Sequence, residues 1–223
     1  MNKKDFYFDL YEKLYQTGYH NDLTLSHTKK LFPYLKEVDG GYKKNKWIPS
    51  FLRKKRYSDK SVKILDVGCS HGLAVEQLIK MGYDAYGIDV SNTAINYCRD
   101  RGLTTCMVGS ATDIPFEDNF FDIIISTDVL EHLLIEDVEK TVSEFKRVVK
   151  GYCLLGIACD KESNEVPLEN VKNTFNAYLD LDTLHTTIID PKEWDKAFLN
   201  KGFEKVRTIS YENYDYEVIY KIS

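Results

Sequence analysis

The sequence predicts an α/β protein built on a doubly wound, mostly parallel sheet with helices on both faces. From Val62 onward, short apolar runs alternate with amphipathic stretches of helical periodicity. The apolar runs do not alternate apolar with polar residues, which is typical of parallel strands buried on both faces. A chain of 223 residues is long enough for one well-packed domain with additional segments.

The first 61 residues differ from the rest, so we predict two regions. They form an N-terminal helical extension and a basic segment, and residues 62–223 form the main domain. Helices are expected over Lys4 to Gln16, where apolar residues recur at helical spacing, and over His27 to Glu37. A polar, acidic insert at about 160–187 interrupts the alternation of strands and helices.

The elements of the main domain follow from apolar runs and from helix start and stop signals. Ser91 is a suitable N-cap, and Gly102 follows the end of the helix that it begins. Asp190-Pro191 combines an N-cap with a proline at the first helical position. The expected strands are 62–67, 85–90, 104–108, 121–127, 152–158, 203–210 and 214–222, and the expected helices are 72–80, 91–101, 138–149 and 191–202.

Composition indicates a soluble globular protein. Hydrophobic residues make up 43% of the chain and charged residues 29%, and no apolar run approaches the roughly 20 residues of a membrane-spanning helix. The net charge is −5, yet Tyr42 to Lys63 carries nine lysines and arginines against one aspartate. A solvated surface is the simpler interpretation of this basic segment. Its interleaved aromatic residues keep a phosphorylated or nucleic-acid partner open.

The cysteines point to a reducing environment. They are odd in number, scattered and without a C-x-x-C pair. This pattern predicts reduced, buried thiols rather than a disulfide framework or a zinc site, so we expect a cytoplasmic location and no bound metal. The N-terminus is charged and unlike a secretion signal. The five cysteines are Cys69, Cys98, Cys106, Cys153 and Cys159.

A glycine-flanked turn follows the first expected strand. Gly68 and Gly72 enclose three residues, and Asp66 precedes the first glycine. Glycine lets the backbone approach a ligand closely, and open α/β sheets bind ligands at the carboxyl ends of their strands. Asp89 lies 21 residues after Gly68, at the end of the second strand. A carboxylate there can accept both ribose hydroxyls of an adenosine group.

This turn resembles the first motif of the class I S-adenosylmethionine-dependent methyltransferases, particularly the subgroup that acts on small molecules. Asp66 to Gly72 is similar to the family pattern D-x-G-x-G-x-G, with Ser70 in place of the middle glycine. Gly109 to Phe116 is similar to the loop G-D-A-x-x-L-P-F. There, Ser110 replaces the acid that often reads the adenine amino group.

Two further segments extend the resemblance. Phe121 to Leu133 is similar to the family's fourth strand and the L-E-H-L sequence after it, and Phe145 to Gly151 is similar to its R-V-L-K-P-G-G stretch. Four segments in the family's order and spacing cover about Val62 to Ala158. The helix from Trp194 to Phe203 extends the resemblance weakly.

The resemblance implies a Rossmann-like sheet of seven strands with the last strand antiparallel. It also implies methyl transfer from S-adenosylmethionine to an oxygen or nitrogen of an acceptor, leaving S-adenosylhomocysteine. A small molecule is the default acceptor. By family position, the residues expected to bind the cofactor are Asp66, Gly68, Cys69, Ser70, Gly72, Asp89, Val90, Ser110, Ala111, Thr112, Thr127 and Asp128.

Candidate residues on the acceptor side follow from position. His132, near the expected methionine end of the cofactor, could take a proton from an acceptor hydroxyl, with helix packing as the equal alternative. His185 lies in a region that the family uses to cover substrate, and catalysis is the less favoured of its two interpretations. The N-terminal segment commonly closes over the cofactor in this family. Tyr15 and Tyr19 could therefore line a lid and contact substrate, although such aromatics are more often core.

Three other functions stay open. Gly68 to Gly72 also fits the G-x-S-x-G elbow of α/β-hydrolases, with Ser70 as nucleophile. That fold needs strands before the elbow, and none is expected before Val62. Ser70 and Ser110 could mark a non-catalytic S-adenosylmethionine-binding protein. The basic segment at 42–63 could direct a methyltransferase to a nucleotide or nucleic acid. The sequence indicates no particular oligomeric state.

Overall fold

The computed structural model describes residues 3–16, 62–160, 164–165, 184–212 and 215–223. Within them one sheet of seven strands dominates. Its strands are β1 (Lys63–Val67), β2 (Asp84–Asp89), β3 (Cys106–Val108), β4 (Phe121–Thr127), β5 (Val149–Ala158), β8 (Phe203–Glu212) and β9 (Asp215–Ile222). They are ordered β3-β2-β1-β4-β5-β9-β8. The first five are mutually parallel, and β9 is antiparallel to β5 and β8.

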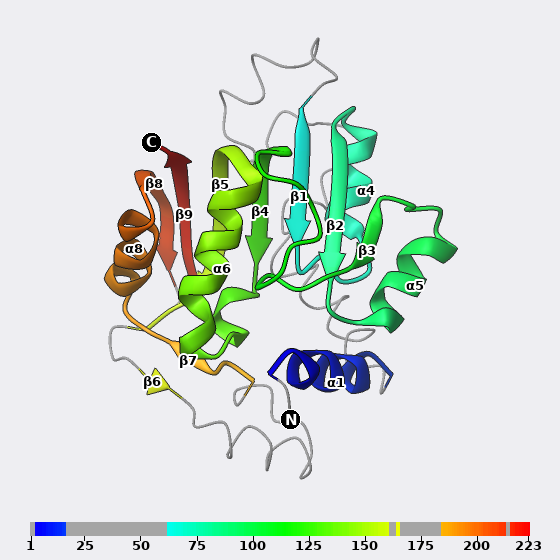
Figure 1. Cartoon of the computed structure of the whole chain (residues 1–223), viewed down its shortest axis with the longest axis horizontal. Helices are drawn as coiled ribbons and strands as arrows, with labels where there is room; N and C mark the ends of the chain where they lie inside the picture. The colour runs from blue at the N-terminus through cyan, green and yellow to red at the C-terminus, as the bar shows by residue number, and fades with distance from the viewer. Residues whose placement is uncertain (1–2, 17–61, 161–163, 166–183, 213–214) are drawn as a thin grey trace.

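Helices cover both faces of this sheet (Figure 1). They are α4 (Leu73–Lys80), α5 (Asn92–Asp100), α6 (Ile135–Val148) and α8 (Pro191–Asn200), with a 3-10 turn η2 (Leu130–His132) before α6. Local sequence fixes two of the starts. Ser91 Oγ accepts a hydrogen bond from Ala94 N at 3.2 Å before α5, and Asp190 Oδ1 accepts one from Lys192 N at 2.8 Å before α8.

The central strands β1 and β4 are largely buried on both sides, as the non-alternating apolar runs predict, whereas residues 204–208 of β8 are exposed. Ile64 belongs to a core cluster with Val75 of α4 and Ile95 of α5. Its neighbour Leu65 belongs to a second cluster, with Val142 of α6 and Phe198 of α8. Successive strand residues point to opposite faces, so two separate cores sandwich the sheet.

The helix α1 (Lys3–Gln16) lies beside the carboxyl ends of β1 and β2, at the bottom of Figure 1. Leu10 and Leu14 are buried in the core cluster shared with α6 and α8. The same helix contacts α5. This part of the N-terminal extension therefore packs against the edge of the sheet where the glycine turn lies.

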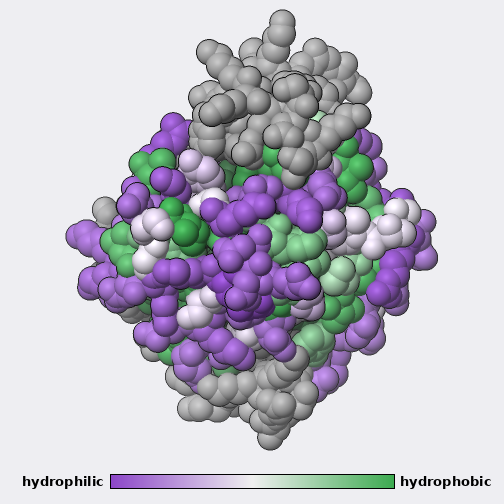
Figure 2. Space-filling view, turned by 45° about the horizontal axis from the view of Figure 1, so that its top comes forward, coloured by the Kyte–Doolittle hydropathy of each residue, from purple (hydrophilic) through white to green (hydrophobic). Residues whose placement is uncertain are grey.

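The surface is mixed. The face in Figure 2 shows hydrophobic residues in small patches separated by hydrophilic ones. Large hydrophobic side chains that are more than two-fifths exposed are scattered over α4, α5, α8 and β8, at Ile79, Tyr97, Leu199 and Val206. None of the helices in the described ranges is long and apolar enough to cross a membrane.

The predicted fold class is confirmed, including the seven strands and the antiparallel last strand. The short antiparallel pair β6 (Asn164–Glu165) and β7 (Thr187–Ile188) was not expected. Strands of two residues are too short to show a periodicity of two. The predicted second helix at 27–37, Tyr19, nearly all of the basic segment and most of the insert lie outside the described residues.

Candidate active site

The turn after β1 is held against β2 by its own backbone. Gly68 N and Cys69 N both donate hydrogen bonds to Ile88 O, at 2.8 and 2.9 Å. Gly68 has a φ of +78°, and a Cβ there would collide with the Val129 side chain, so only glycine suits this close approach. Ser70, at the middle-glycine position, also has a left-handed φ, +48°. For a residue with a Cβ this costs about 1–2 kcal/mol.

The Asp89 carboxylate lies directly against this turn. Its Oδ2 accepts a hydrogen bond from Ser70 N at 2.9 Å, and its Oδ1 accepts one from Ser91 N at 3.0 Å. The Tyr15 hydroxyl of α1 also donates to Oδ2, at 3.4 Å. Asp89 is only 7% exposed. The Tyr15 hydroxyl therefore already donates to the carboxylate that we assigned to the ribose hydroxyls.

Two buried carboxyl groups make this edge acidic. Burial, and then the charge of Asp89, raise the pKa of Asp66 to about 7. Burial also raises the pKa of Asp89 to about 6, against the hydrogen bonds from Ser91 N and Ser70 N, which lower it. A cationic ligand would relieve this repulsion because it stabilises both carboxylates.

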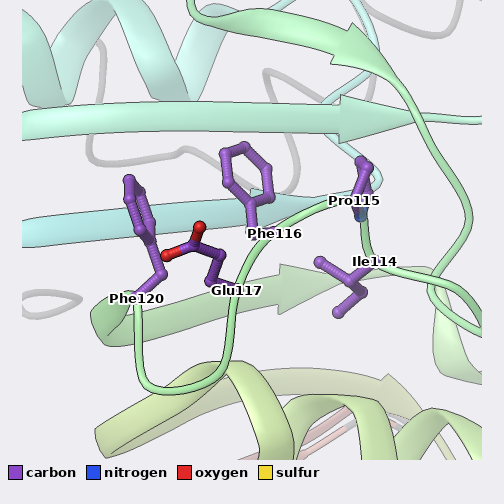
Figure 3. Close-up of a pocket in the computed structure, with 5 residues that line it drawn as sticks. All are labelled: Ile114, Pro115, Phe116, Glu117 and Phe120. Atoms are coloured by element: carbon purple, nitrogen blue, oxygen red, sulfur yellow. The ribbon is translucent and has the colours of Figure 1, made fainter.

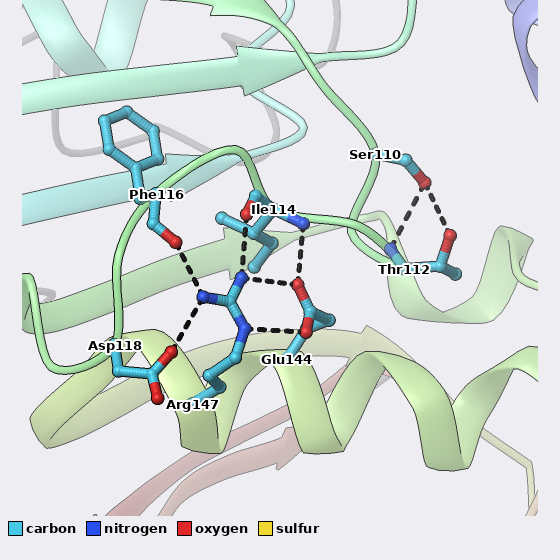
Figure 4. A network of polar contacts seen from close by, with 7 residues as sticks. All are labelled: Ser110, Thr112, Ile114, Phe116, Asp118, Glu144 and Arg147. Carbon is cyan, nitrogen blue, oxygen red and sulfur yellow. Dashed lines mark hydrogen bonds and ion pairs between the residues drawn. The ribbon is translucent and has the colours of Figure 1, made fainter.

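The loop after β3 carries the next predicted residues. Ser110 Oγ and Thr112 Oγ1 are hydrogen-bonded at 2.9 Å, and Thr112 N donates to Ser110 Oγ at 3.2 Å (Figure 4). Ser110, Ala111 and Thr112 are all buried. In the structure as it stands, Ser110 therefore stabilises its own turn.

A clamp from α6, which the sequence reasoning missed, fixes the same loop (Figure 4). Glu144 Oε2 accepts a hydrogen bond from Ile114 N at 2.8 Å. The Arg147 guanidinium donates to Ile114 O at 2.8 Å and to Phe116 O at 2.6 Å, and it pairs with Glu144 at 2.7 Å. The sequence does contain a signal for this clamp, because Glu144 and Arg147 are spaced three residues apart on one helix.

A hollow of about 450 Å³ lies along the outer part of this loop (Figure 3). Phe116 and Phe120 line it with their rings stacked 5.3 Å apart, and the other lining residues are Ile114, Pro115 and Glu117. None of the five is a predicted cofactor residue, so this hollow is separate from the Asp89 turn.

The two predicted catalytic histidines come together. The rings of His132 and His185 are 4.7 Å apart, edge to face, and the Tyr11 ring of α1 lies 6.0 Å from His132. Thr186 and Thr187 hold His185 there, because both hydroxyls donate to Leu133 O at 2.6 Å. A residue 53 positions along the chain from His132 is thereby fixed beside η2.

The other predicted residues occupy the same edge of the sheet. Val90 follows β2, and Thr127 ends β4. Asp128 has a φ of +52°, and its N–H donates to Gly156 O at 3.1 Å. Tyr15 lies against Asp89 and His71, with its ring 5.5 Å from the His71 ring. Tyr15 is thus on the side of the glycine turn, away from the histidine pair.

Two side-chain groups in the described ranges could hold a metal ion. The first is Glu131, His132 and His185, and the second is Cys69, Cys98 and Cys106. Within each group the potential ligand atoms lie within 4.8 Å of one another. Glu131 is fully buried, and its Oε1 accepts a hydrogen bond from Ala158 N at 3.1 Å.

The geometry does not support the hydrolase alternative. Ser70 Oγ is buried, and no histidine nitrogen in the described part of the chain is hydrogen-bonded to it. Serine nucleophiles need such a base. β1, which precedes the turn, is also the first strand of the described sheet.

Comparisons with known proteins show that this chain is similar to methyltransferases. Residues 65–155 match the family described as "Methyltransferase domain". Ubiquinone biosynthesis O-methyltransferase of Methylococcus capsulatus is 34% identical over 40% of this chain and 39% of the relative. The tRNA (carboxymethyluridine(34)-5-O)-methyltransferase of Arabidopsis thaliana is 32% identical over 46% of this chain and 26% of the relative. The matched part therefore spans well under half the length of these two relatives.

A solved methyltransferase structure has a similar fold. Magnesium protoporphyrin IX methyltransferase of Synechocystis PCC 6803, solved with bound S-adenosylhomocysteine, superposes with a TM-score of 0.57. The superposition covers 78% of this chain and 80% of that protein, at 18% identity. At this identity the match concerns the fold alone.

Proposed function

Because this chain carries a class I S-adenosylmethionine-dependent methyltransferase domain, we propose that it methylates an oxygen of a small-molecule acceptor. The observation that carries the proposal is the Asp89 carboxylate, fixed at the carboxyl end of β2 against the glycine turn. Oxygen is preferred to nitrogen because both relatives described above are named as O-methyltransferases.

The residues present suit S-adenosylmethionine. Asp89 Oδ2, which accepts a hydroxyl from Tyr15, would accept a ribose hydroxyl in its place, and the turn from Gly68 to Gly72 would face the methionine part. The two buried carboxyl groups suit a ligand that carries positive charge. When bound, the cofactor supplies a methyl group on a positively charged sulfur, which an acceptor lone pair can attack. The residues after β3 would surround the adenine.

His132 is the proposed base. Its Nδ1 lies 3.1 Å from Leu184 O, and a carbonyl oxygen only accepts, so Nδ1 carries the proton of the neutral ring. Nε2 is then the basic nitrogen. Nε2 would take the proton of the acceptor hydroxyl as that oxygen is methylated, while the cofactor would supply the methyl group and be left as S-adenosylhomocysteine. His185 would orient the His132 ring or the acceptor.

The test is transfer of tritium-labelled methyl groups from S-adenosylmethionine to a panel of small phenols, catechols, carboxylic acids and amines. On an accepted compound, His132→Ala should lower kcat by about 10²–10⁴-fold while leaving affinity for S-adenosylhomocysteine unchanged. Full activity of both His132→Ala and His185→Ala would exclude a histidine base. Activity lost in EDTA and restored by Mg²⁺ would assign Glu131, His132 and His185 to a metal ion instead.

Nucleic acid is the second candidate acceptor. The support is the match to a tRNA methyltransferase over 46% of this chain and the basic segment between Tyr42 and Lys63. Bulk tRNA in the same labelling assay separates the two acceptors. If tRNA is labelled, replacing Lys54, Lys55 and Arg56 by alanine should reduce the labelling, because these cations would contact phosphates. Cofactor binding without labelling of any acceptor would favour the non-catalytic alternative.

The segments around the domain have proposed roles as well. The extension over residues 1–61 would act as a lid, of which α1 is the described part. The insert at about 160–187, bracketed by β6 and β7, would cover the acceptor beside the histidine pair. All five cysteines lie in the described ranges and are buried thiols outside any disulfide, which supports the expected cytoplasmic location.

A further inference from the structure

Three cysteines from three different elements meet beneath the glycine turn. Cys69 belongs to the turn itself, Cys98 to α5 and Cys106 to β3. They are 5%, 0% and 2% exposed. Their three Sγ atoms lie within 4.8 Å of one another, so small side-chain shifts would bring them to the separation of about 3.8 Å that metal–sulfur bonds of about 2.3 Å give around one tetrahedral ion.

The other two cysteines show that burial alone does not bring thiols together. Cys153 and Cys159 are also buried, and thiols often pack as small apolar groups. Neither belongs to a group of potential metal ligands in the described part of the chain. Convergence from a turn, a helix and a strand therefore distinguishes Cys69, Cys98 and Cys106 from the other two thiols.

The surroundings leave room beside two of the sulfurs. A Cβ at Gly72 would come within 2.9 Å of Cys98 Sγ and 3.4 Å of Cys106 Sγ, so the missing side chain leaves space next to them. Thiolates, not thiols, bind metals.

We propose that Cys69, Cys98 and Cys106 form a binding site for one soft, thiophilic metal ion. On binding, three metal–sulfur bonds form and the three thiol protons pass to solvent. A soft ion matches thiolate ligands, whereas Mg²⁺ and Ca²⁺ prefer oxygen. Three buried thiolates would be costly without a cation, so the ion and the deprotonated sulfurs stabilise each other. The site does not depend on the proposed methyl transfer.

The test is titration of the reduced, full-length chain with Cd²⁺, followed by the ultraviolet sulfur-to-metal charge-transfer absorption. We expect one Cd²⁺ per chain and a Tm increase of about 5–10 °C at a hundredfold excess over Kd, with neither effect from Mg²⁺. Cys98→Ser should lose the absorption band and the Tm increase. The matched control Cys153→Ser, also a buried cysteine, should keep both.

X-ray absorption of the Cd²⁺-loaded wild-type protein tests the site without any substitution, should Cys98→Ser fold poorly. Three sulfur neighbours are expected around the metal. A first shell of oxygen or nitrogen, no binding by the wild-type chain, or equal losses in Cys98→Ser and Cys153→Ser would overturn the proposal. Because none of these measurements involves cofactor or acceptor, failure here leaves the proposed function standing.

Discussion

At the scale of single residues, the buried carboxyl groups of Asp66 and Asp89 make this edge of the sheet acidic. Both carboxyl groups are buried, and each lies at the carboxyl end of a parallel strand. Asp89 is compensated by two backbone N–H donors. Asp66 has a raised pKa because burial and the charge of Asp89 both disfavour its ionised form. Without a ligand, ionised Asp66 therefore costs stability.

The consequence is a specific dependence of stability on pH. The folded pKa of Asp66, about 7, exceeds its unfolded value of roughly 3.9, so the folded state binds this proton more tightly. The contribution of Asp66 to the free energy of unfolding should then fall as pH rises from about 4 to about 7. Asp66→Asn should be more stable than wild type at pH 7.5 by about 2 kcal/mol, less than the full shift implies because the buried amide keeps a polar cost.

Urea unfolding at pH 5 and pH 7.5 measures this difference. The stability gained by Asp66→Asn should be larger at pH 7.5 than at pH 5. Parallel pH profiles for wild type and Asp66→Asn would show that Asp66 does not titrate in this range.

At the scale of elements, one carboxylate makes the hydrogen bonds that join α1 to the start of α5. Glu12 Oε2 accepts hydrogen bonds from Ser91 Oγ at 2.8 Å and Thr93 N at 3.0 Å, and its Oε1 accepts one from Thr93 Oγ1 at 2.8 Å. Burial would raise the pKa of Glu12, but these hydrogen bonds outweigh it and lower the pKa. The negative charge also lies at the N-terminus of α5, which favours it.

Glu12→Ala should therefore release α1. Loss of the charge-assisted hydrogen bonds should weaken docking by about 2 kcal/mol, seen as faster hydrogen exchange of the α1 amides and of Thr93 N–H. If α1 acts as the lid, undocking removes Tyr15 from Asp89. The association and dissociation rates of S-adenosylhomocysteine should then both rise several-fold, because opening limits both.

The matched control is Glu76→Ala, which removes a carboxylate from α4 that pairs with Lys80 and Arg101. This variant should leave the exchange of α1 and both ligand rates unchanged. Faster exchange of α1 in Glu12→Ala with unchanged ligand rates would limit α1 to a structural role.

For the whole molecule, the fold could be predicted because β1, β2, β4 and β5 are largely buried apolar runs and the caps of the helices are local signals. The predicted 121–127 strand is β4 (Phe121–Thr127) itself, and the predicted caps Ser91 and Asp190 both make capping hydrogen bonds. The meeting of the predicted cofactor residues at one edge followed from the same logic, since carboxyl ends of parallel strands meet at one edge.

The site details that involve distant partners could not be predicted. His185 reaches His132 through the hydroxyls of Thr186 and Thr187 on Leu133 O, a contact without periodicity in the sequence. The hydrogen bond of Tyr15 to Asp89 spans 74 positions. The convergence of the three thiols depends on how a turn, a helix and a strand pack, which spacing alone does not reveal. Local patterns fix elements, whereas tertiary packing decides which side chains meet.

The most direct test of the central claim, that the β1–β2 edge binds S-adenosylmethionine through Asp89, is calorimetric titration with S-adenosylhomocysteine. The wild-type chain should bind one molecule in the micromolar range. Asp89→Ala should bind about 100-fold more weakly, since the hydrogen bond of a ribose hydroxyl to a carboxylate is lost, whereas Ser70→Gly should bind at least as well as wild type. Equal affinity of Asp89→Ala and wild type, or no binding by a folded wild-type chain, would contradict the claim.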